Sequence, residues 1–471
     1  MKPFSKITPI KLPIKVALTV LLCLAGALPV AAQTAEEPQR EQLLNGLRIL
    51  ILPRPGAREV FMSLRIHSGA AFDVAGKSGE MAVLGDILFP DPTTREYFTD
   101  EMGGRLDVDT DLDAITVIMQ GNADQFERIV EILRTALVTT QISPENVARI
   151  RDGRIKIVKD TAVSPGVLAD RAIAARLFGE FPYGRPATGS PESLARVDRA
   201  DLLLARERFL NANNATLTII GGVTRNRAVR ALRQLLGPWR KSEQIIPTTF
   251  RQPEAPDPRP LIINAPADQS AEVRLAVRGL GRSDRDFQAA TLLAVVARQR
   301  WERLSPEISR RPVFVRHEAH VLPGIFVMGA GVDNLMVGQA LKKAREVMLS
   351  LIASPISSAE LDQAKAEVTT QLAKDLARPE GIARVWLDVD TFGLPSDQTT
   401  LWTSVTTADL QRVAARLFRD VPIASVVLGD SKQLQAALEP SVKVELMGEL
   451  ERPTSKSETK PTMTIPSKKP E

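Results

Sequence analysis

The order of predicted strands and helices in the first half of the chain repeats in the second half, and this repeat strongly constrains the fold. The strand EVFMSLRIHSG (residues 59–69) has a counterpart in EVRLAVRGL (272–280), and the helix ISPENVARIRDGR (142–154) has one in ISSAELDQAKAEV (356–368). Likewise, TLTIIGGVTRNRAVRAL (216–232) corresponds to SVVLGDSKQLQAAL (425–438). Repeats of about 20 to 50 residues would predict a solenoid, whereas a period of about 200 residues predicts a tandem pair of homologous α+β domains.

The boundaries of the two domains follow from composition. Residues 245–261 contain five prolines and show no periodicity, which is typical of a linker between domains. The end of the chain is rich in Lys, Pro, Ser and Thr and is nearly free of apolar residues, so it is expected to be disordered. The predicted parts are a polar leader (33–41), an N-terminal domain (42–244), a linker (245–261), a C-terminal domain (262–440) and a disordered tail (441–471).

Hydrophobic periodicity predicts the elements of the first unit. Strands are expected at 47–52, 60–66 and 215–220, with a strand pair or one long strand at 106–119. Helices are expected at 93–103, 123–139, 144–160, 166–178, 198–210 and 225–236. The remaining segment, SGEMAVLGDILF (78–89), begins like a helix but carries almost no functional side chains.

The first 32 residues have the pattern of a secretory signal peptide. Residues 2–15 hold four lysines and no acidic residue, the apolar run 16–30 follows, and Val30-Ala31-Ala32 has the small residues that signal peptidase accepts. The single cysteine, Cys23, lies inside this segment, so the mature protein is expected to have no disulfide. The run is too short for a transmembrane helix, and we expect a soluble periplasmic protein.

The net charge of +5 does not indicate a polyanionic partner. The signal segment contributes +4, and residues 451–471 contribute +2 from five basic and three acidic residues. Subtracting both from +5 leaves −1 for residues 33–450. A nearly neutral folded body does not support nucleic-acid binding.

Three sequence blocks carry a family resemblance. They are LFGEFPYGRPATGSPESL (177–194), NNATLTIIGGV (213–223) and GGRLDVDTDLDAITV (103–117). On these blocks, nearly all of residues 42–440 resembles the two-domain bacterial M16 metallopeptidases, the insulinase, pitrilysin and mitochondrial-processing-peptidase family. The resemblance implies an α+β fold with two homologous M16-type domains in a clam-shell arrangement, each an antiparallel-rich sheet with helices packed on one face.

The zinc site of that family is degenerate in this chain. Active members carry His-x-x-Glu-His, which places two imidazoles and a general base on one helix face. The family register puts Ala82 and Asp86 at the histidines and Gly85 at the glutamate. The third ligand falls at Lys156 or Ile157, and only a shifted register would bring in Asp152 or Asp160. We therefore expect no zinc cofactor, and a cation such as Lys156 would further oppose one.

A second catalytic element of the family is also missing. In some members the catalytic groups come from two chains. One chain supplies the zinc site, and the other supplies an Arg/Tyr pair that binds the substrate carbonyl. The resemblance places Glu307 at the arginine and Phe314 at the tyrosine, although Arg310 or Arg311 would substitute if the loop is shifted.

A peptide-binding surface is compatible with the sequence. Gly103 and Gly104 with the following strand resemble the family's edge strand, to which peptides add through main-chain hydrogen bonds. Four aspartates are expected on one alternating face of this strand and would favour basic peptides: Asp107, Asp109, Asp111 and Asp113. The alternative is a solvated strand face that protects the edge against unwanted pairing.

The three histidines do not predict a metal site. His317 and His320 are three apart on a predicted strand, where they point to opposite faces, and His67 is expected to be a turn residue. We therefore predict a non-catalytic M16-like subunit, inactive on its own, that pairs with an active M16 zinc peptidase and shapes its peptide chamber. The alternatives are a stand-alone periplasmic peptide-binding protein and, least favoured, an active zinc endopeptidase.

Overall fold

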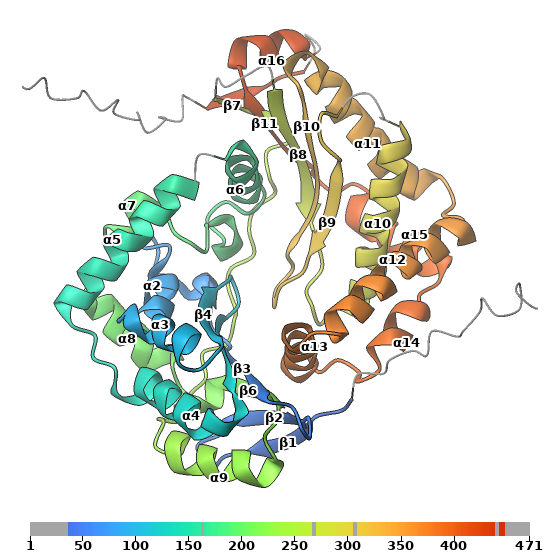
Figure 1. Ribbon diagram of the computed structural model, residues 1–471. Helices are drawn as coiled ribbons and strands as arrows, with labels where there is room; N and C mark the ends of the chain where they lie inside the picture. Colours follow the sequence, from blue (N-terminus) through green and yellow to red (C-terminus); the bar gives the residue numbers. More distant parts are fainter. Residues whose placement is uncertain (1–35, 162–163, 266–269, 305–308, 439–441, 448–471) are drawn as a thin grey trace, which may run out of the picture.

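A computed structural model describes residues 36–161, 164–265, 270–304, 309–438 and 442–447. The predicted signal peptide, Glu307 and residues 448–471 lie outside these ranges, and so does Cys23. Within them the chain forms two six-stranded sheets, each accompanied by helices (Figure 1). The α+β, two-domain prediction is confirmed.

The first half of the chain forms the N-terminal sheet and the helices around it. Its strands are β1 (Gln39–Gln42), β2 (Arg48–Pro53), β3 (Glu59–Ile66), β4 (Arg105–Thr110), β5 (Ile115–Asn122) and β6 (Ala215–Gly221). Its α-helices are α2 (Glu80–Asp86), α3 (Thr93–Asp100), α4 (Phe126–Arg134), α5 (Pro144–Thr161), α6 (Pro165–Phe178), α7 (Pro191–Leu194), α8 (Arg199–Phe209) and α9 (Arg225–Leu236). Short helical turns are η1 (Ala70–Phe72), η2 (Ala123–Gln125), η3 (Thr135–Thr139), η4 (Pro182–Gly184) and η5 (Ala212–Asn214).

The second half repeats this arrangement. Its strands are β7 (Leu261–Asn264), β8 (Ser270–Arg278), β9 (Phe314–Glu318), β10 (Ile325–Asp333), β11 (Ala424–Gly429) and β12 (Glu445–Met447). Its helices are α10 (Phe287–Leu304), α11 (Val337–Ala353), α12 (Ser358–Leu376), α13 (Pro379–Phe392), α14 (Gln398–Thr403), α15 (Thr407–Phe418) and α16 (Ser431–Ala437), with the turn η6 (Asn334–Met336).

The two sheets have the same strand order. The first runs β1-β2-β6-β3-β5-β4 and the second runs β12-β7-β11-β8-β10-β9, so five strands of each sheet have a counterpart in the other. The outer strands differ, because β1 begins its domain and is antiparallel to β2, whereas β12 ends its domain and is parallel to β7. In both sheets the second and third strands of this order are parallel and the third and fourth are antiparallel. The repeat seen in the sequence is therefore a repeat of topology.

Two predicted boundaries differ from the structure. Strand β1 lies almost entirely in the predicted polar leader and pairs with β2, and strand β12 lies in the predicted disordered tail and pairs with β7. Both are short, exposed strands that join an existing sheet edge. Main-chain hydrogen bonds hold such strands, so their side chains need no apolar pattern.

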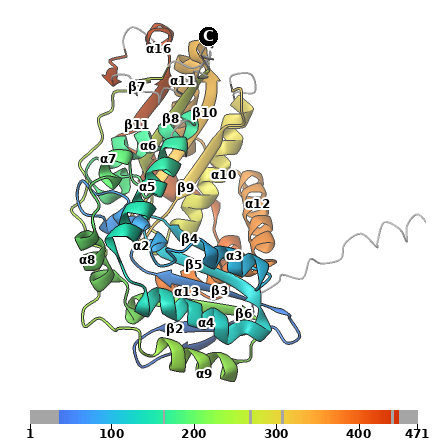
Figure 2. The ribbon, with the colours of Figure 1, turned by 60° about the vertical axis from the view of Figure 1, so that its left-hand side comes forward.

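Each sheet is covered on one face by a helix of the other domain. Helix α13 packs on β3 and β6 of the first sheet, and helix α6 packs on β8 and β11 of the second (Figures 1 and 2). The α13 contact buries three residues of the helix and four of the sheet: Ala383, Trp386, Val389, Leu50, Leu52, Phe61 and Ile220. The α6 contact buries Ile173, Leu177 and Phe178 of the helix with Ala276, Val327, Val426 and Leu428 of the sheet. We call this reciprocal packing of α6 and α13 the cross-brace.

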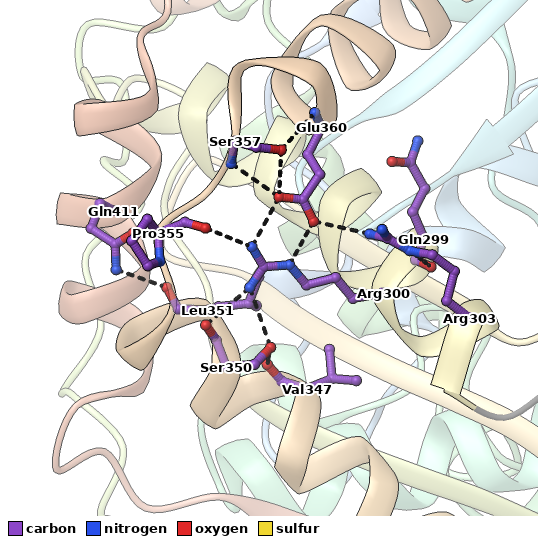
Figure 3. A network of polar contacts seen from close by, with 10 residues as sticks. All are labelled: Gln299, Arg300, Arg303, Val347, Ser350, Leu351, Pro355, Ser357, Glu360 and Gln411. Carbon is purple, nitrogen blue, oxygen red and sulfur yellow. Dashed lines mark hydrogen bonds and ion pairs between the residues drawn. The ribbon is translucent and has the colours of Figure 1, made fainter.

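A buried ion pair ties the helices of the C-terminal domain together. The Glu360 carboxylate at the start of α12 accepts from Arg300 Nε at 2.8 Å and from Arg303 Nη2 at 2.9 Å (Figure 3). Arg300 also donates to the Ser350 carbonyl oxygen in α11. Chiefly because Arg300 donates to it, the pKa of Glu360 is lowered from 4.5 to about 2.

In the described ranges, no helix is both long enough and apolar enough to cross a membrane.

Candidate functional site

Helix α2 stands where the resemblance places the zinc-binding helix, and its start is well ordered by polar contacts. Asp73 accepts hydrogen bonds from the backbone N–H groups of Gly79 at 2.6 Å and Met81 at 2.8 Å. Burial raises the pKa of Asp73 to about 7, against the opposing effect of these two hydrogen bonds. Gly79 adopts φ +92°, a conformation that favours glycine. The helix is therefore firmly positioned although it carries no metal-binding motif.

The positions of the missing motif are filled by packing. Ala82 is fully buried. Gly85 faces the edge of the sheet, and a Cβ built there would lie 2.9 Å from Thr110 Oγ1 and 3.3 Å from both Val108 and Ile115. A side chain at position 85 therefore requires the side chains of Thr110, Val108 and Ile115 to shift. Glycine fits this close contact with the sheet without such a shift.

The remaining polar residue of the motif, Asp86, binds a guanidinium. Its Oδ2 accepts from Arg154 Nη2 at 2.6 Å and from Arg154 Nε at 2.9 Å, and both side chains are largely buried, at 25% and 17% exposure. We call Ala82, Gly85, Asp86 and Arg154 the pseudo-site. The Arg154 guanidinium therefore neutralises the Asp86 carboxylate through two charge-assisted hydrogen bonds.

The two residues predicted at the position of the third zinc ligand are exposed to solvent. Lys156 is exposed and Ile157 is 66% exposed, so neither faces α2, and the cation opposite Asp86 is Arg154. Asp152 is exposed and pairs with its neighbour Arg151, while Asp160 is also exposed. Arg154 lies two and three residues before Lys156 and Ile157, which is less than one helical turn.

A zinc ion does not fit the pseudo-site. Zinc needs three or four nitrogen, sulfur or oxygen ligands at about 2.0–2.3 Å. Here one carboxylate is available and a guanidinium already binds it. Within the described part of the chain, no cluster of three or more His, Cys, Asp or Glu residues has the arrangement of a metal site.

The predicted edge strand lies at the sheet edge as expected, but its acidic face is shorter. Strand β4 is the last strand of its sheet and ends at Thr110. Asp107 and Asp109 are exposed on it, whereas Asp111 and Asp113 belong to the following turn. Gly103 has φ +60°, and a Cβ at Gly104 would lie 1.9 Å from the Gln120 carbonyl oxygen, so both glycines are needed for the approach to β5.

Asp113 connects the two domains instead of facing a peptide. It accepts from Tyr183 Oη at 2.8 Å, His320 Nδ1 at 3.1 Å and the Val321 backbone N–H at 3.0 Å. Burial alone would lower the pKa of His320, but the hydrogen bond and charge of Asp113, with Asp111, outweigh it and raise that pKa. A strongly hydrogen-bonded turn explains why the alternating aspartates do not form one continuous face.

The other two histidines are structural. His317, in β9, bonds the Leu280 backbone N–H and Thr291, and burial lowers its pKa to about 4. His67 follows β3 and contacts Arg48 and Thr216, and burial lowers its pKa to about 3. His320 lies beyond β9, so His317 and His320 share no partner and form no ligand pair.

The second-domain segment likewise shows no Arg/Tyr pair. Phe314 lies at the start of β9, and its ring stacks between the guanidinium groups of Arg274 and Arg316 at 4.8 and 4.4 Å from the ring centroid. Arg310 pairs with Asp333 and Arg311 with Glu272, so each candidate substitute arginine has a carboxylate partner. Phe314 has no hydroxyl group and therefore cannot donate a hydrogen bond to a substrate carbonyl as a tyrosine would.

Sequence reasoning missed three features. Arg154 is a single cation within a helix rich in basic residues, and no local pattern separates it from Arg149 or Arg151. The contact of Asp113 with His320 spans 207 residues, so it has no local signal. The covering of each sheet by the other domain's helix could have been found from the apolar strands 215–221 and 424–429, which are buried along their whole length.

Comparison with known proteins agrees with the resemblance. Residues 196–368 match the protein family described as Peptidase M16 inactive domain. Two relatives are named as uncharacterized zinc proteases. The relative from Rickettsia felis is 21% identical, and the match covers 43% of this chain and 50% of the relative. The relative from Mycobacterium bovis is 24% identical, and the match covers 54% of this chain and 59% of the relative. The chain thus spans little more than half the length of these relatives.

Solved structures share the fold. A protease from Helicobacter pylori has a TM-score of 0.76 at 16% identity, covering 83% of this chain and 100% of that one. A peptidase M16 inactive domain from Pseudomonas fluorescens has a TM-score of 0.74 at 18% identity, with 84% and 98% covered. The periplasmic protease PqqL from Escherichia coli has a TM-score of 0.69 at 17% identity, with 88% of this chain and 50% of that chain covered.

Proposed function

On the premise that the chain is an M16-like protein that matches the family's inactive domain, we propose that it is the non-catalytic subunit of a heterodimer with an active M16 zinc peptidase. In this proposal the partner supplies zinc and the general base, and this chain completes the peptide chamber. The observation that carries the proposal is the pair between Asp86 and Arg154, which puts a guanidinium where a metal ligand would be needed.

The cross-brace supports the need for a second chain. Helix α13 covers the first sheet at β3 and β6, and helix α6 covers the second at β8 and β11, so little of these strands is left open to a polypeptide between the domains. A polar cavity that does lie between them, around Arg65, Asp113, His320 and Asp388, has a volume of about 480 Å³. That volume suits a small molecule rather than a polypeptide. A peptide chamber therefore requires a surface from another chain.

The length of a structural relative supports the same arrangement. This chain covers half of PqqL, so that protease is long enough to hold a second segment of similar size. A pair of separate chains would supply two such halves without a covalent connection.

The test is reconstitution with a periplasmic M16 chain that carries His-x-x-Glu-His. We expect the purified chain alone to hold substoichiometric zinc and to leave a quenched peptide library uncleaved. The mixture should elute as one complex and cleave peptides faster than the active chain by itself. Cleavage by this chain alone that stops with a chelator and with Asp86→Asn would refute the proposal.

A matched control separates the subunit interface from the pseudo-site. Arg154→Gln removes the guanidinium from Asp86 but leaves the surface of the molecule almost unchanged, because Arg154 is only 17% exposed. We expect this variant still to form the complex and to support cleavage. If it abolished cleavage without affecting assembly, the pseudo-site would have a direct part in the reaction.

A second candidate is peptide binding without a partner. The open edge of β4 with exposed Asp107 and Asp109 supports it, since main-chain pairing needs no catalytic residue. Titration calorimetry with extended peptides should show preference for Lys- and Arg-containing sequences, reduced by Asp109→Lys. The exposed Glu101→Lys, outside the strand, is the charge-matched control. Equal binding of acidic and basic peptides would contradict this candidate.

Export forms part of the proposal and has its own test. If residues 1–32 are a cleaved signal peptide, the protein recovered from the periplasm begins at Gln33. Intact mass measurement of the periplasmic protein distinguishes this from an uncleaved chain.

A further inference from the structure

The turn between β4 and β5 of the N-terminal domain contacts the turn between β9 and β10 of the C-terminal domain. Because these strands hold the same places in the two sheets, the two turns correspond to each other in the repeat. Asp113 lies in the first turn and His320 in the second, 207 residues further along the chain. The domains are therefore joined here by polar groups, in addition to the apolar packing of α6 and α13.

The Asp113 carboxylate is held from both domains. Its Oδ1 accepts from Tyr183 Oη at 2.8 Å, and its Oδ2 accepts from the Val321 backbone N–H at 3.0 Å and from His320 Nδ1 at 3.1 Å. The Tyr183 hydroxyl in turn accepts from the Leu322 backbone N–H at 3.1 Å. Burial and the charge of Asp113 raise the pKa of Tyr183 above its usual range, so Tyr183 stays neutral and keeps donating. Both oxygens of Asp113 therefore depend on this contact.

His320 can exchange a proton with solvent without losing its hydrogen bond to Asp113. Its side chain is 21% exposed and lines the polar cavity of about 480 Å³ between the domains. Nε2 has no hydrogen-bond partner among the described residues, and it is not buried out of reach of water. Because Asp113 is an acceptor, Nδ1 carries a hydrogen in both the neutral and the charged ring. A change of pH therefore changes the charge of the contact and leaves the hydrogen bond in place.

The groups nearest to His320 favour its charged form. Burial opposes a charge on the ring, but the hydrogen bond and charge of Asp113, with the charges of Asp111 and Glu318, outweigh burial and raise the pKa of His320. Glu318 lies on β9 and also pairs with Arg316 at 3.1 Å. The side chains of His320 and Asp113 are mostly shielded from water, so their charges attract each other more strongly than exposed ones would.

The other basic groups around this cavity keep one charge state near neutral pH. Three of them are arginines, which stay protonated, and each is paired with a carboxylate. Burial lowers the pKa of His67 to about 3 and that of the neighbouring His317 to about 4, so both rings are neutral. The arginine pairs are Arg65 and Arg282 with Asp388, and Arg384 with Asp375.

The other ionic contacts between the domains contain no histidine. Among the described residues they join arginines to carboxylates, which ordinarily titrate near pH 4. The contact of His320 with Asp113 is therefore the one that changes charge near neutral pH within this part of the chain. The other pairs are Arg48 with Asp390, Arg65 with Asp388, Arg105 with Glu380, and Arg274 and Arg316 with Asp170.

We propose that the contact between Asp113 and His320 is a pH-sensitive latch between the two domains, which a proton on His320 closes and which loosens when that proton leaves. The closed latch binds the proton more tightly than the open one, because the contact raises the pKa of His320 above its ordinary value of 6.5. Its stabilising effect is therefore complete below about pH 6.5 and is lost as the pH rises through the higher pKa of the closed form. Both residues belong to this chain, so the latch does not rest on the proposed pairing with a peptidase.

The first measurement is the titration of the histidine rings by NMR on protein with isotope-labelled histidine. The chain has three histidines, so each ring can be assigned by substitution with glutamine. We expect His320 to titrate above pH 6.5 and its pKa to fall in Asp113→Asn, which removes the charge but keeps an acceptor for Nδ1. A pKa of His320 at or below 6.5, or one that Asp113→Asn leaves unchanged, contradicts the proposal.

The second measurement is hydrogen exchange, corrected for the intrinsic effect of pH on amide exchange. The N–H groups of Val321 and Leu322 bond to acceptors in the other domain, so they exchange when the latch opens. Their protection should fall between about pH 6 and pH 9, by about tenfold for each unit by which the pKa of His320 exceeds 6.5. Protection that does not change over this range would refute the latch.

Two variants make the exchange result specific. His320→Gln keeps a donor for Asp113 but has no titratable ring, so its protection should not depend on pH, even if Asp113→Asn fails to fold. Asp107→Asn removes a charge that is 56% exposed on β4 and pairs with Arg105, so it is the control and should behave like the wild type. If His320→Gln shows the same pH dependence as the wild type, His320 is not the titrating group.

Asp73 also changes charge in this range, and its position separates it from the latch. Burial raises its pKa to about 7, and it accepts the backbone N–H groups of Gly79 and Met81. Its titration should change exchange at the start of α2, and that change should persist in His320→Gln. A pH dependence confined to α2 would assign the whole effect to Asp73 and exclude the latch.

Discussion

Replacing Trp386 with alanine tests whether the cross-brace holds the N-terminal sheet. Trp386 belongs to the C-terminal domain but is 1% exposed in a cluster with Leu50, Phe61 and Ile220 of the other domain. Removing a buried tryptophan side chain costs about 3–5 kcal/mol, from lost transfer energy plus the cavity left behind. Because α13 covers β3 and β6, we expect much of this loss in the stability of the N-terminal strands.

Hydrogen exchange measured by mass spectrometry separates the two domains. A loss of about 3 kcal/mol corresponds to a rise of about 100-fold in exchange through opening of α13. We expect this rise in peptides covering 48–53, 59–66 and 215–221. Peptides from α10 and α11, which pack on other elements of the C-terminal domain, should change much less.

Two further variants make the result specific. Trp402→Ala removes the same type of side chain from the C-terminal domain's own core, so its exchange should rise first in α10 and α14. Trp386→Phe should cost much less than Trp386→Ala, because it keeps most of the aromatic surface and the indole Nε1 that it removes has no hydrogen-bond partner among the described residues. Unchanged exchange of the N-terminal strands in Trp386→Ala would refute the cross-brace as a source of their stability.

Three other predictions concern the pseudo-site and the helix layer. In urea unfolding, a double-mutant cycle of Asp86→Asn and Arg154→Gln should give a coupling of about 1 kcal/mol, and no coupling would contradict the pair. Gly85→Glu should destabilise the protein by about 1–3 kcal/mol in the same assay, whereas Gly153→Glu, which has open space around its Cβ, should not. Glu360 has a lowered pKa, so its stabilising effect is complete above pH 4.5 and is lost as the pH falls toward 2. Thus Glu360→Gln should cost at most about 3 kcal/mol at pH 7, and its difference from wild type should shrink between pH 4.5 and 2.

The sequence predicts the elements well where their pattern is local. The expected helix at 225–236 matches α9 at both ends, and strands at 47–52 and 60–66 differ from β2 and β3 by one residue. The segment 106–119 forms a strand pair because Asp111 accepts the backbone N–H groups of Asp113 and Ala114 and so closes the turn. Alternation of side chains alone left open whether this was one strand or two.

The sequence predicts which residues occupy α2 at the motif positions, but it does not predict the residue that pairs with Asp86. The positions of Ala82, Gly85 and Asp86 follow from helix register within one element, and the structure places them together on α2. Arg154, the partner of Asp86, lies 68 residues away on helix α5. A shift of two residues along a helix rotates the side chain by about half a turn, so the residue that faces Asp86 depends on the exact alignment of the two helices. Pairing across such distances depends on how helices pack, which a helix's own periodicity does not specify.

The pseudo-site is packed without a metal ion, and the packing that joins the two domains lies elsewhere. A catalytic zinc ion can add to stability because it binds only the folded protein. In this chain Arg154 supplies the opposing charge to Asp86, and Ala82 and Gly85 complete the packing of α2. The domains are joined elsewhere, through α6 and α13, by apolar clusters that contain no residue of the pseudo-site. The pseudo-site and the packing that joins the two domains are therefore physically separate, so residues of the pseudo-site can change without disturbing that packing.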